Sequence, residues 1–211
     1  MSLQGHHSFI EFVLTLHHFR QNETLGRYRL AEYLGLTKDQ TRPIIQFLAD
    51  KGLITKLSRR EGHTLSEVGK EYITKLSKYM HISPTHVYFG SDYTVGSKDA
   101  VVCLDATGIE QLNTVVLRDE ALLAGSKGCT VFFQESTKNI YLLNVLYPPL
   151  PPSPLNSRKV KKRIQKITED LLWENIIVIV GTADTFALAQ KGAMAAGSLF
   201  LSDELKIPLL F

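Results

Sequence analysis

The sequence predicts an α+β protein with two domains, residues 1–82 and 86–211. The chain has 211 residues, about one and a half times the ~150 residues used as an average domain size. Apolar residues follow helical spacing up to about residue 80 and form strand-like runs after it. Charge divides at the same place. Residues 1–85 contain twelve Lys/Arg and eight Asp/Glu, a net +4, whereas residues 86–211 contain twelve and thirteen, a net −1. The basic N-terminal part favours an anionic partner such as nucleic acid.

The composition is typical of a globular protein. Hydrophobic residues make up 44% of the chain, charged residues 21%, and the mean hydropathy is −0.02, which argues against disordered and membrane classes. No apolar run approaches the ~18 residues that span a bilayer. The N-terminus lacks the charged region of a signal peptide, and Glu11, His17 and His18 interrupt its apolar stretch. We therefore expect a cytoplasmic protein without a membrane partner.

Three helices are expected at the start of the chain. The second covers residues 28–34 and ends at Gly35, where the chain needs the left-handed conformation. The third opens at Thr37, which forms a capping-box pattern with Gln40 three residues later. The first covers residues 8–20 and carries an apolar stripe at helical spacing, formed by Phe9, Phe12, Val13, Leu16 and Phe19.

A hairpin and a fourth helix follow. Residues 53–57 alternate as a strand, residues 59–62 form a tight reversal, and residues 63–65 return as a second strand. Ser66 is in position to cap the fourth helix. The apolar residues of that helix share one face, which is formed by Val68, Tyr72, Leu76 and Tyr79.

Three short runs carry a family resemblance. They are Leu30–Thr37 (LAEYLGLT), Leu48–Ile54 (LADKGLI) and Leu65–Gly69 (LSEVG). In this order and spacing they resemble the winged helix-turn-helix of MarR-like and related prokaryotic regulators, over about residues 8–80. The resemblance implies a DNA-binding domain. Its third helix would enter the major groove, and its hairpin, the wing, would reach the backbone or the minor groove.

The resemblance implies DNA contacts from the third helix, the wing and the start of the second helix. Arg42 has the fork that suits guanine, and Gln40 or Gln46 has the amide that suits adenine. Arginines at the wing tip suit phosphates or a narrow minor groove. A solvated surface shows the same polar residues, so this alternative stays open. The expected contact residues are Arg29, Lys38, Gln40, Arg42, Gln46, Arg59 and Arg60.

Pro43 allows two arrangements of the third helix, because a proline inside a helix costs about 3 kcal/mol and removes a backbone hydrogen bond. Either the helix bends at Pro43, or residues 38–42 form a tighter turn and Pro43 is the first helical residue. The second arrangement would move Lys38 out of the DNA groove.

The second domain alternates strands and helices. Strand, helix, strand, strand, helix, strand is the split βαβ order of ferredoxin-like folds, which we expect here. Many unrelated proteins share that order, so it indicates an architecture and not a ligand. The expected strands are 87–89, 100–104, 129–134, 140–146 and 176–180, and the expected helices are 109–124, 157–173 and 184–196.

Two features of the second domain favour an anion. Residues 158–163 bring cations into the first turns of a helix, an end that already carries partial positive charge. The turn after the strand 176–180 opens a helix, where backbone N–H groups can face an anion. The alternatives are a solvated basic face and a turn whose amides are taken up by a cap. The expected anion contacts are Arg158, Lys159, Lys161, Lys162, Thr182 and Thr185.

Catalysis has little support in the sequence. No GxSxG, HExxH, paired-carboxylate or Cys–His signature stands out, and Cys103 and Cys129 lie in apolar strands and outside any CxxC spacing. We therefore expect no enzyme activity, no cofactor and no metal.

As a whole, the chain resembles archaeal two-domain regulators that join a winged helix to an uncharacterised conserved domain. This implies a sequence-specific transcriptional regulator that binds double-stranded DNA. We expect a homodimer, because one winged helix covers only a half-site. The second domain would sense a small-molecule effector, dimerise, or both. Two other functions stay open. The winged helix could bind a protein in a larger assembly, or it could regulate a small-molecule enzyme in the second domain.

Overall fold

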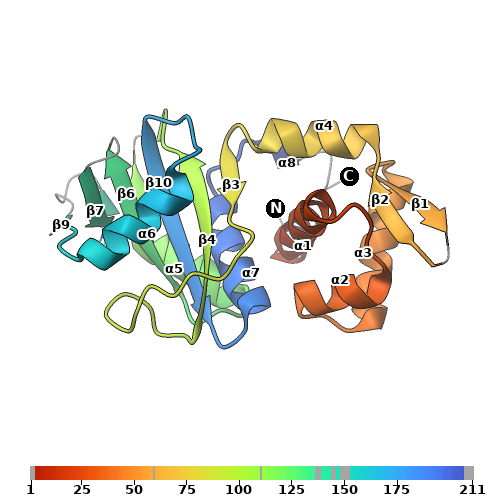
Figure 1. Ribbon diagram of the computed structural model, residues 1–211, viewed down its shortest axis with the longest axis horizontal. Helices are drawn as coiled ribbons and strands as arrows, with labels where there is room; N and C mark the ends of the chain where they lie inside the picture. Colours follow the sequence, from red (N-terminus) through yellow and green to blue (C-terminus); the bar gives the residue numbers. More distant parts are fainter. Residues whose placement is uncertain are drawn as a thin grey trace. The chain divides into compact units, whose positions relative to one another are not determined.

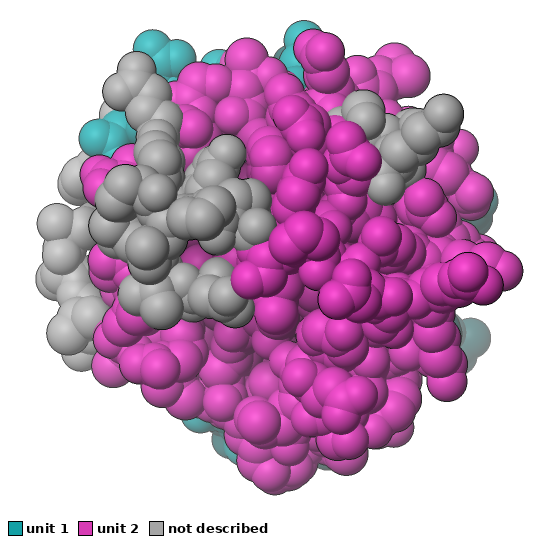
Figure 2. Space-filling model, turned by 90° about the vertical axis from the view of Figure 1, so that its left-hand side faces the viewer, with its two compact units in different colours: residues 1–78, 201–211 teal, residues 79–200 magenta. Residues whose placement is uncertain are grey.

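The chain folds into two compact units, which are coloured separately in Figure 2. Unit 1 contains the chain up to Lys78 and the segment from Leu201, and unit 2 contains Tyr79–Phe200. The sequence placed the boundary a few residues later and the C-terminal segment in the second domain. The computed structural model describes residues 3–58, 60–109, 111–135, 139–143, 146–147 and 153–206.

Unit 1 follows the order helix, helix, helix, hairpin, helix (Figure 1). The two strands pair antiparallel with an irregularity between Lys56 and Ser58, and Leu25 forms an isolated bridge with His63. A short helix of the C-terminal segment completes the unit. The elements are α1 (Leu3–Gln21), α2 (Arg27–Leu34), α3 (Lys38–Asp50), β1 (Ile54–Ser58), β2 (Gly62–Leu65), α4 (Glu67–Leu76) and α8 (Asp203–Lys206).

The core of unit 1 forms around α1, which starts at Leu3, earlier than the expected residue 8. The apolar stripe of α1 is buried, and Phe12 stacks on Phe47 of α3 with ring centroids 4.2 Å apart. The hydroxyl of Tyr72 donates to the Leu205 carbonyl at 2.8 Å and connects α4 to α8. Burial raises the pKa of Tyr72, so this hydroxyl stays a donor.

The expected helix caps are confirmed. Thr37 Oγ1 accepts a hydrogen bond from the Gln40 amide at 3.2 Å, and Gln40 Oε1 accepts one from the Thr37 amide at 2.9 Å. Gly35 ends α2 with φ 61°, and Ser66 caps α4 by accepting from the Gly69 amide. These helix ends lie where the sequence indicates, because each is set by capping residues within a few positions of the end.

Pro43 lies inside α3, as its sixth residue. The helix begins at Lys38, so the arrangement in which Pro43 is the first helical residue is wrong. Proline has no N–H, so the Asp39 carbonyl loses its helical partner. Asp39 and Pro43 are both exposed, and water can hydrogen-bond to that carbonyl instead. The capping box holds the preceding turn in helical geometry, and Lys38 therefore stays on the helix.

Unit 2 contains a six-stranded antiparallel sheet in the order β3-β4-β10-β6-β7-β9. The long β10 is central, and Val178 lies between Cys103 of β4 and Phe132 of β6. Two short strands, β5 (Leu112–Asn113) and β8 (Leu146–Tyr147), pair separately. The strands of the main sheet are β3 (Met80–Ile82), β4 (Lys98–Asp105), β6 (Cys129–Glu135), β7 (Asn139–Leu143), β9 (Ser153–Pro154) and β10 (Asn175–Ala183).

Helices cover both faces of this sheet (Figure 1). On one face, α7 (Phe186–Ser198) packs on β4 and β10 and against α5 (Thr114–Leu123). Gly181 of β10 permits this approach, because a Cβ there would meet the backbone of α7. On the other face, α6 (Arg158–Thr168) buries Val160 and Ile164 against the sheet.

The expected ferredoxin-like arrangement needs correction. The order β4-α5-β6-β7-α6-β10 agrees with the β-α-β-β-α-β pattern, but a ferredoxin-like sheet carries both helices on one face. Here β9 pairs beside β7 at the sheet edge before α6 begins. As a result, α6 joins the two antiparallel strands β9 and β10, and the handedness rule for parallel crossovers does not set its face.

Several expected elements of unit 2 also differ, and the helix expected at 157–173 ends at Thr168. Residues 87–89 form no strand. The Phe89 amide donates to the Asp99 carboxylate at 2.8 Å and not to the backbone of a neighbouring strand. The helix expected at 109–124 begins only at Thr114, after Asn113 caps it with its side chain. No helix in the described residues is both long and apolar enough to cross a membrane.

Candidate functional site

The outer face of α3 presents the side chains expected to contact DNA. Its inner face is buried through Ile44, Ile45 and Leu48. Lys38, Arg42 and Gln46 follow one another at intervals of four residues and are all exposed. They therefore lie on one solvent-facing stripe of the helix.

These side chains differ in how free they are. In the described part of the chain, Arg42 makes no polar contact. Gln46 Nε2 donates to Asp50 Oδ1 at 2.8 Å across one exposed turn. Gln40 uses its side chain in the capping box, so it can contact a base only if it gives up the cap. Among the expected base contacts on α3, Arg42 is thus the most available.

Tyr28 of α2 is a candidate that the sequence analysis missed. Tyr28 is 59% exposed. Lys38 Nζ lies 4.2 Å from the ring centroid and Arg27 Cζ lies 5.6 Å from it. These are cation–π distances. Two cations therefore lie against this ring, beside the N-terminus of α3. The run Arg27-Tyr28-Arg29 at a helix start is the signal that could have identified it.

Arg29 of α2 is oriented by Tyr33, a residue of the same helix. Its Nε donates to the Tyr33 hydroxyl at 3.1 Å, and Cζ lies 5.7 Å from the Tyr33 ring centroid. The Tyr33 ring in turn stacks on His18 of α1 with centroids 4.8 Å apart. Arg29 is exposed, so this support orients the guanidinium without removing it from solvent.

The β1–β2 hairpin carries Arg60, which is exposed in the turn between the two strands. Arg59 lies outside the described residues. His63 pairs with Lys56 across the hairpin. Burial lowers the pKa of His63, and the charge of Lys56 lowers it further. The hairpin thus has an exposed arginine in its turn and a neutral imidazole at the second residue of β2.

In unit 2, the expected anion contacts on α6 face solvent. Ser157 caps the helix by accepting from the Val160 amide. Arg158, Lys159 and Lys162 are exposed, and Lys161 is half-buried. No ion pair involves these four residues in the part of the chain that the structure describes. The helix therefore presents uncompensated positive charge.

The end of β10 and the turn that follows it are less available to an anion. Thr182 is 2% exposed, and its hydroxyl accepts from the Gly96 amide at 2.7 Å. Thr185 caps α7 by accepting from the Leu188 amide at 3.3 Å. Lys127 Nζ lies 2.6 Å from Asp184 Oδ1. Internal partners thus occupy the groups that were expected to meet an anion there.

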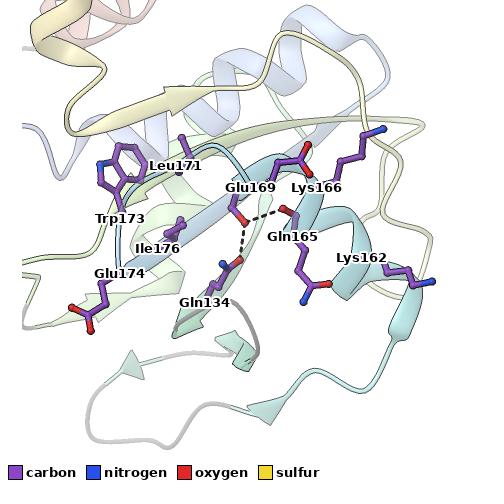
Figure 3. A pocket seen from close by; sticks show the side chains of 10 residues that line it. Gln134, Lys162, Gln165, Lys166, Glu169, Leu171, Trp173, Glu174 and Ile176 are labelled. Carbon is purple, nitrogen blue, oxygen red and sulfur yellow. Dashed lines mark hydrogen bonds between the residues drawn. The ribbon is translucent and has the colours of Figure 1, made fainter.

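A groove of about 780 Å³ runs beside α6, and the sequence analysis missed it (Figure 3). Ligand sites in proteins are commonly about 300–1,000 Å³. Gln134, Thr168 and Ile176 are the buried residues of its lining. Trp173 and Lys162 line it as well. These residues come from β6, α6, β10 and the segment before β10, and only the fold brings them together.

The described residues show no constellation suited to a thiol nucleophile or a metal. Burial raises the pKa of both Cys103 and Cys129 to about 12, which keeps them as thiols. No group of three or more His, Cys, Asp or Glu side chains converges within the described part of the chain.

Comparison with known proteins shows a fold relative. No protein-family model matches the chain, and no curated protein matches it. Among solved structures, the hypothetical protein PH0730 from Pyrococcus horikoshii OT3 is similar, with a TM-score of 0.68 and 22% sequence identity. The match covers 95% of this chain and 97% of that one. The similarity therefore extends over both units, and it shows a shared fold.

Proposed function

We propose that the protein is a sequence-specific double-stranded DNA-binding transcriptional regulator. Unit 1 has the element order of a winged helix-turn-helix, with α2 and α3 joined by a short turn and β1–β2 as the wing. The observation that carries the proposal is the α3 stripe of Lys38, Arg42 and Gln46, exposed on a helix whose opposite face is buried. Such a helix presents its N-terminal half to the edges of bases in the major groove.

The surroundings of α3 support the same proposal. Tyr28 holds Lys38 and Arg27 near the start of α3, and Arg29 is oriented by Tyr33. Cations in such positions suit phosphates on either side of the groove, which fix the orientation of a protein on the duplex. Arg60 on the wing suits a phosphate or a narrow minor groove.

The proposal extends to the whole chain. One winged helix covers a half-site, so we propose a homodimer that reads two half-sites. Unit 2 is proposed to sense a small-molecule effector or to dimerise. Its groove beside α6 supports the sensing role, because its volume and its mixed apolar and polar lining are those of a ligand site.

Fluorescence anisotropy tests DNA binding. The full chain is titrated with random-sequence duplex DNA at ~50 and ~200 mM salt, followed by selection of enriched sequences. We expect steep salt dependence and an enriched palindrome. Lys38→Gln/Arg42→Gln should reduce both affinity and sequence preference. Lys75→Gln/Lys78→Gln removes two charges from the other end of unit 1 and is the control, which should bind as the unaltered chain does.

The opposite result points to a different function. If the folded chain binds no DNA at low salt, the DNA-binding proposal is wrong. A winged helix that binds a protein partner would then be favoured, and pull-down of a dominant partner dependent on Arg42 would support it.

A further inference from the structure

The groove beside α6 has a buried polar floor. Gln134 and Thr168 are each 4% exposed, and the Thr168 hydroxyl donates to Gln134 Oε1 at 3.0 Å (Figure 3). The same hydroxyl lies 3.1 Å from the Ile164 carbonyl oxygen, so Thr168 links the Gln134 amide to α6. Within the described residues, Gln134 Nε2 has no hydrogen-bond partner. A nearly buried donor is thus left for a molecule in the groove.

The groove also has an aromatic and apolar side. Trp173 precedes β10 and is half-buried, and it lines the groove together with Leu171 and Ile176. Figure 3 labels both Trp173 and Gln134 among the side chains that line the groove. A flat ring is the ligand shape that gains most from an indole, because stacking uses the whole face of both rings.

A stripe of cations lies along the helix that borders the groove. Lys159, Lys162 and Lys166 recur at intervals of three and four residues, so they share one face of α6, and all are exposed. Lys162 and Lys166 line the groove. Glu169 and Glu174 also line it, and both follow Lys166 in the chain. The Lys162 end is therefore the positive end, and an anionic group belongs there.

We propose that this groove binds a nucleotide, a flat heterocycle that carries a phosphate group. The base lies against Trp173, and its hydrogen-bonding edge faces the amide of Gln134. The phosphate lies toward Lys162 and Lys166. An amide that faces a heterocycle edge and a lysine that faces a phosphate are complementary pairs.

The assignment gives the sensing role proposed for unit 2 a ligand class. It rests on the proposed function only for its consequence, which is a change in DNA affinity when the nucleotide binds. Nucleotide binding itself is measured on the chain without DNA. A failure of DNA binding and a failure of nucleotide binding are therefore separate results.

Trp173 provides the measurement, because it is the one tryptophan of the chain. The full chain is titrated with AMP, GMP, CMP and UMP while tryptophan fluorescence is followed at the red edge of its absorption band. At least one nucleotide should quench the emission saturably. The nucleoside of the nucleotide that binds most tightly lacks the phosphate, and ribose 5-phosphate lacks the base. Each should bind more weakly than that nucleotide by about tenfold.

Two variants locate the site. Lys162→Ala should weaken binding by about tenfold, because it removes one charge-assisted contact. Lys98→Ala removes an exposed lysine outside the groove and is the matched control, expected to bind as the unaltered chain does. Gln134→Leu should weaken binding of every base. Its circular dichroism and thermal transition separate lost binding from lost fold.

Three results would overturn the assignment. The first is the absence of a saturable response to any of the four nucleotides at millimolar concentration in the folded chain. The second is equal affinity for ribose 5-phosphate and for the nucleotide that binds most tightly, which would show binding of an anion without the base. The third is equal nucleotide affinity for Lys162→Ala and Lys98→Ala.

Discussion

The ammonium group of Lys38 lies 4.2 Å from the centre of the Tyr28 ring. Lys38 is the first residue of α3, where the helix dipole disfavours a cation. The electron-rich face of the ring offsets that penalty and holds the charge near the N-terminus of the helix. A basic side chain is thus kept where a DNA backbone would pass in the proposed complex.

The first prediction concerns this pair. Tyr28→Ala should weaken DNA binding by about two- to fivefold, corresponding to the roughly 0.5–1 kcal/mol of an exposed cation–π contact. Tyr28→Phe keeps the ring and should bind almost as the unaltered chain does. Anisotropy titrations of both variants on the selected duplex measure the effect. An equal loss in Phe and Ala variants would assign the contribution to the hydroxyl.

Arg42 should determine one base position. Its side chain is exposed on α3 and makes no polar contact within the described residues. Arg42→Ala should cost about 1–3 kcal/mol of binding free energy on the selected site. It should cost much less on a site altered at the one base pair that Arg42 contacts. Affinities for a set of singly substituted duplexes test this. A uniform loss across the whole set would make Arg42 a phosphate contact.

Pro43 should lower the stability of unit 1. Pro43→Ala restores the amide that the exposed Asp39 carbonyl lacks, and alanine is about 3 kcal/mol more favourable than proline inside a helix. Because proline also restricts the unfolded chain, we expect a net gain of about 1–2 kcal/mol in the free energy of unfolding. Urea denaturation measures it. Arg42→Ala, on the same exposed face, is the control, and its change should stay within about 0.5 kcal/mol. A Pro43→Ala variant no more stable than that control contradicts the prediction.

Unit 1 was largely predictable because its signals are local. The capping box of Thr37 and Gln40, the left-handed Gly35 and the cap at Ser66 each depend on residues within a few positions of one another. What the sequence could not show is which polar side chains are already engaged. The use of Gln40 in the cap was visible as a pattern, yet the same residue was also expected to contact a base.

Unit 2 was less predictable because its features depend on distant segments. The β-α-β-β-α-β order follows from periodicity. The position of α6 on the opposite face depends on β9, a two-residue strand that leaves no periodic signal. Gln134, Thr168 and Trp173 meet only after three elements have packed. No regular spacing along the chain connects them. The sequence therefore predicted an anion near the cations of α6 but gave no sign of the groove beside that helix.

Gly181 should be intolerant of substitution. A Cβ at this position of β10 would lie too close to the Ala189 carbonyl and the Ala193 amide of α7, which are backbone atoms that cannot move alone. Gly181→Ala should therefore cost about 3 kcal/mol or more in the free energy of unfolding, at the upper end of overpacking effects. Gly26→Ala is the control, since its Cβ would meet no atom within 4 Å and its φ of −85° suits alanine. Thermal denaturation of the two variants compares them, and equal transition temperatures would contradict the close packing of α7 on β10.

The last prediction concerns pH and His63. Burial, and then the charge of Lys56, lower the pKa of His63 in the folded chain below its ordinary value of 6.5. The unfolded chain thus binds the proton more readily than the folded chain does. The resulting contribution to stability is fully present above pH 6.5, and it falls as the pH drops from 6.5 toward the folded-state pKa. Replacing His63 by Gln removes this titration, so the variant should lose less stability than the unaltered chain between about pH 7 and pH 5. Urea denaturation of both proteins at several pH values in this range measures the difference. Parallel curves for the two proteins would show that the imidazole of His63 titrates alike in the folded and unfolded states.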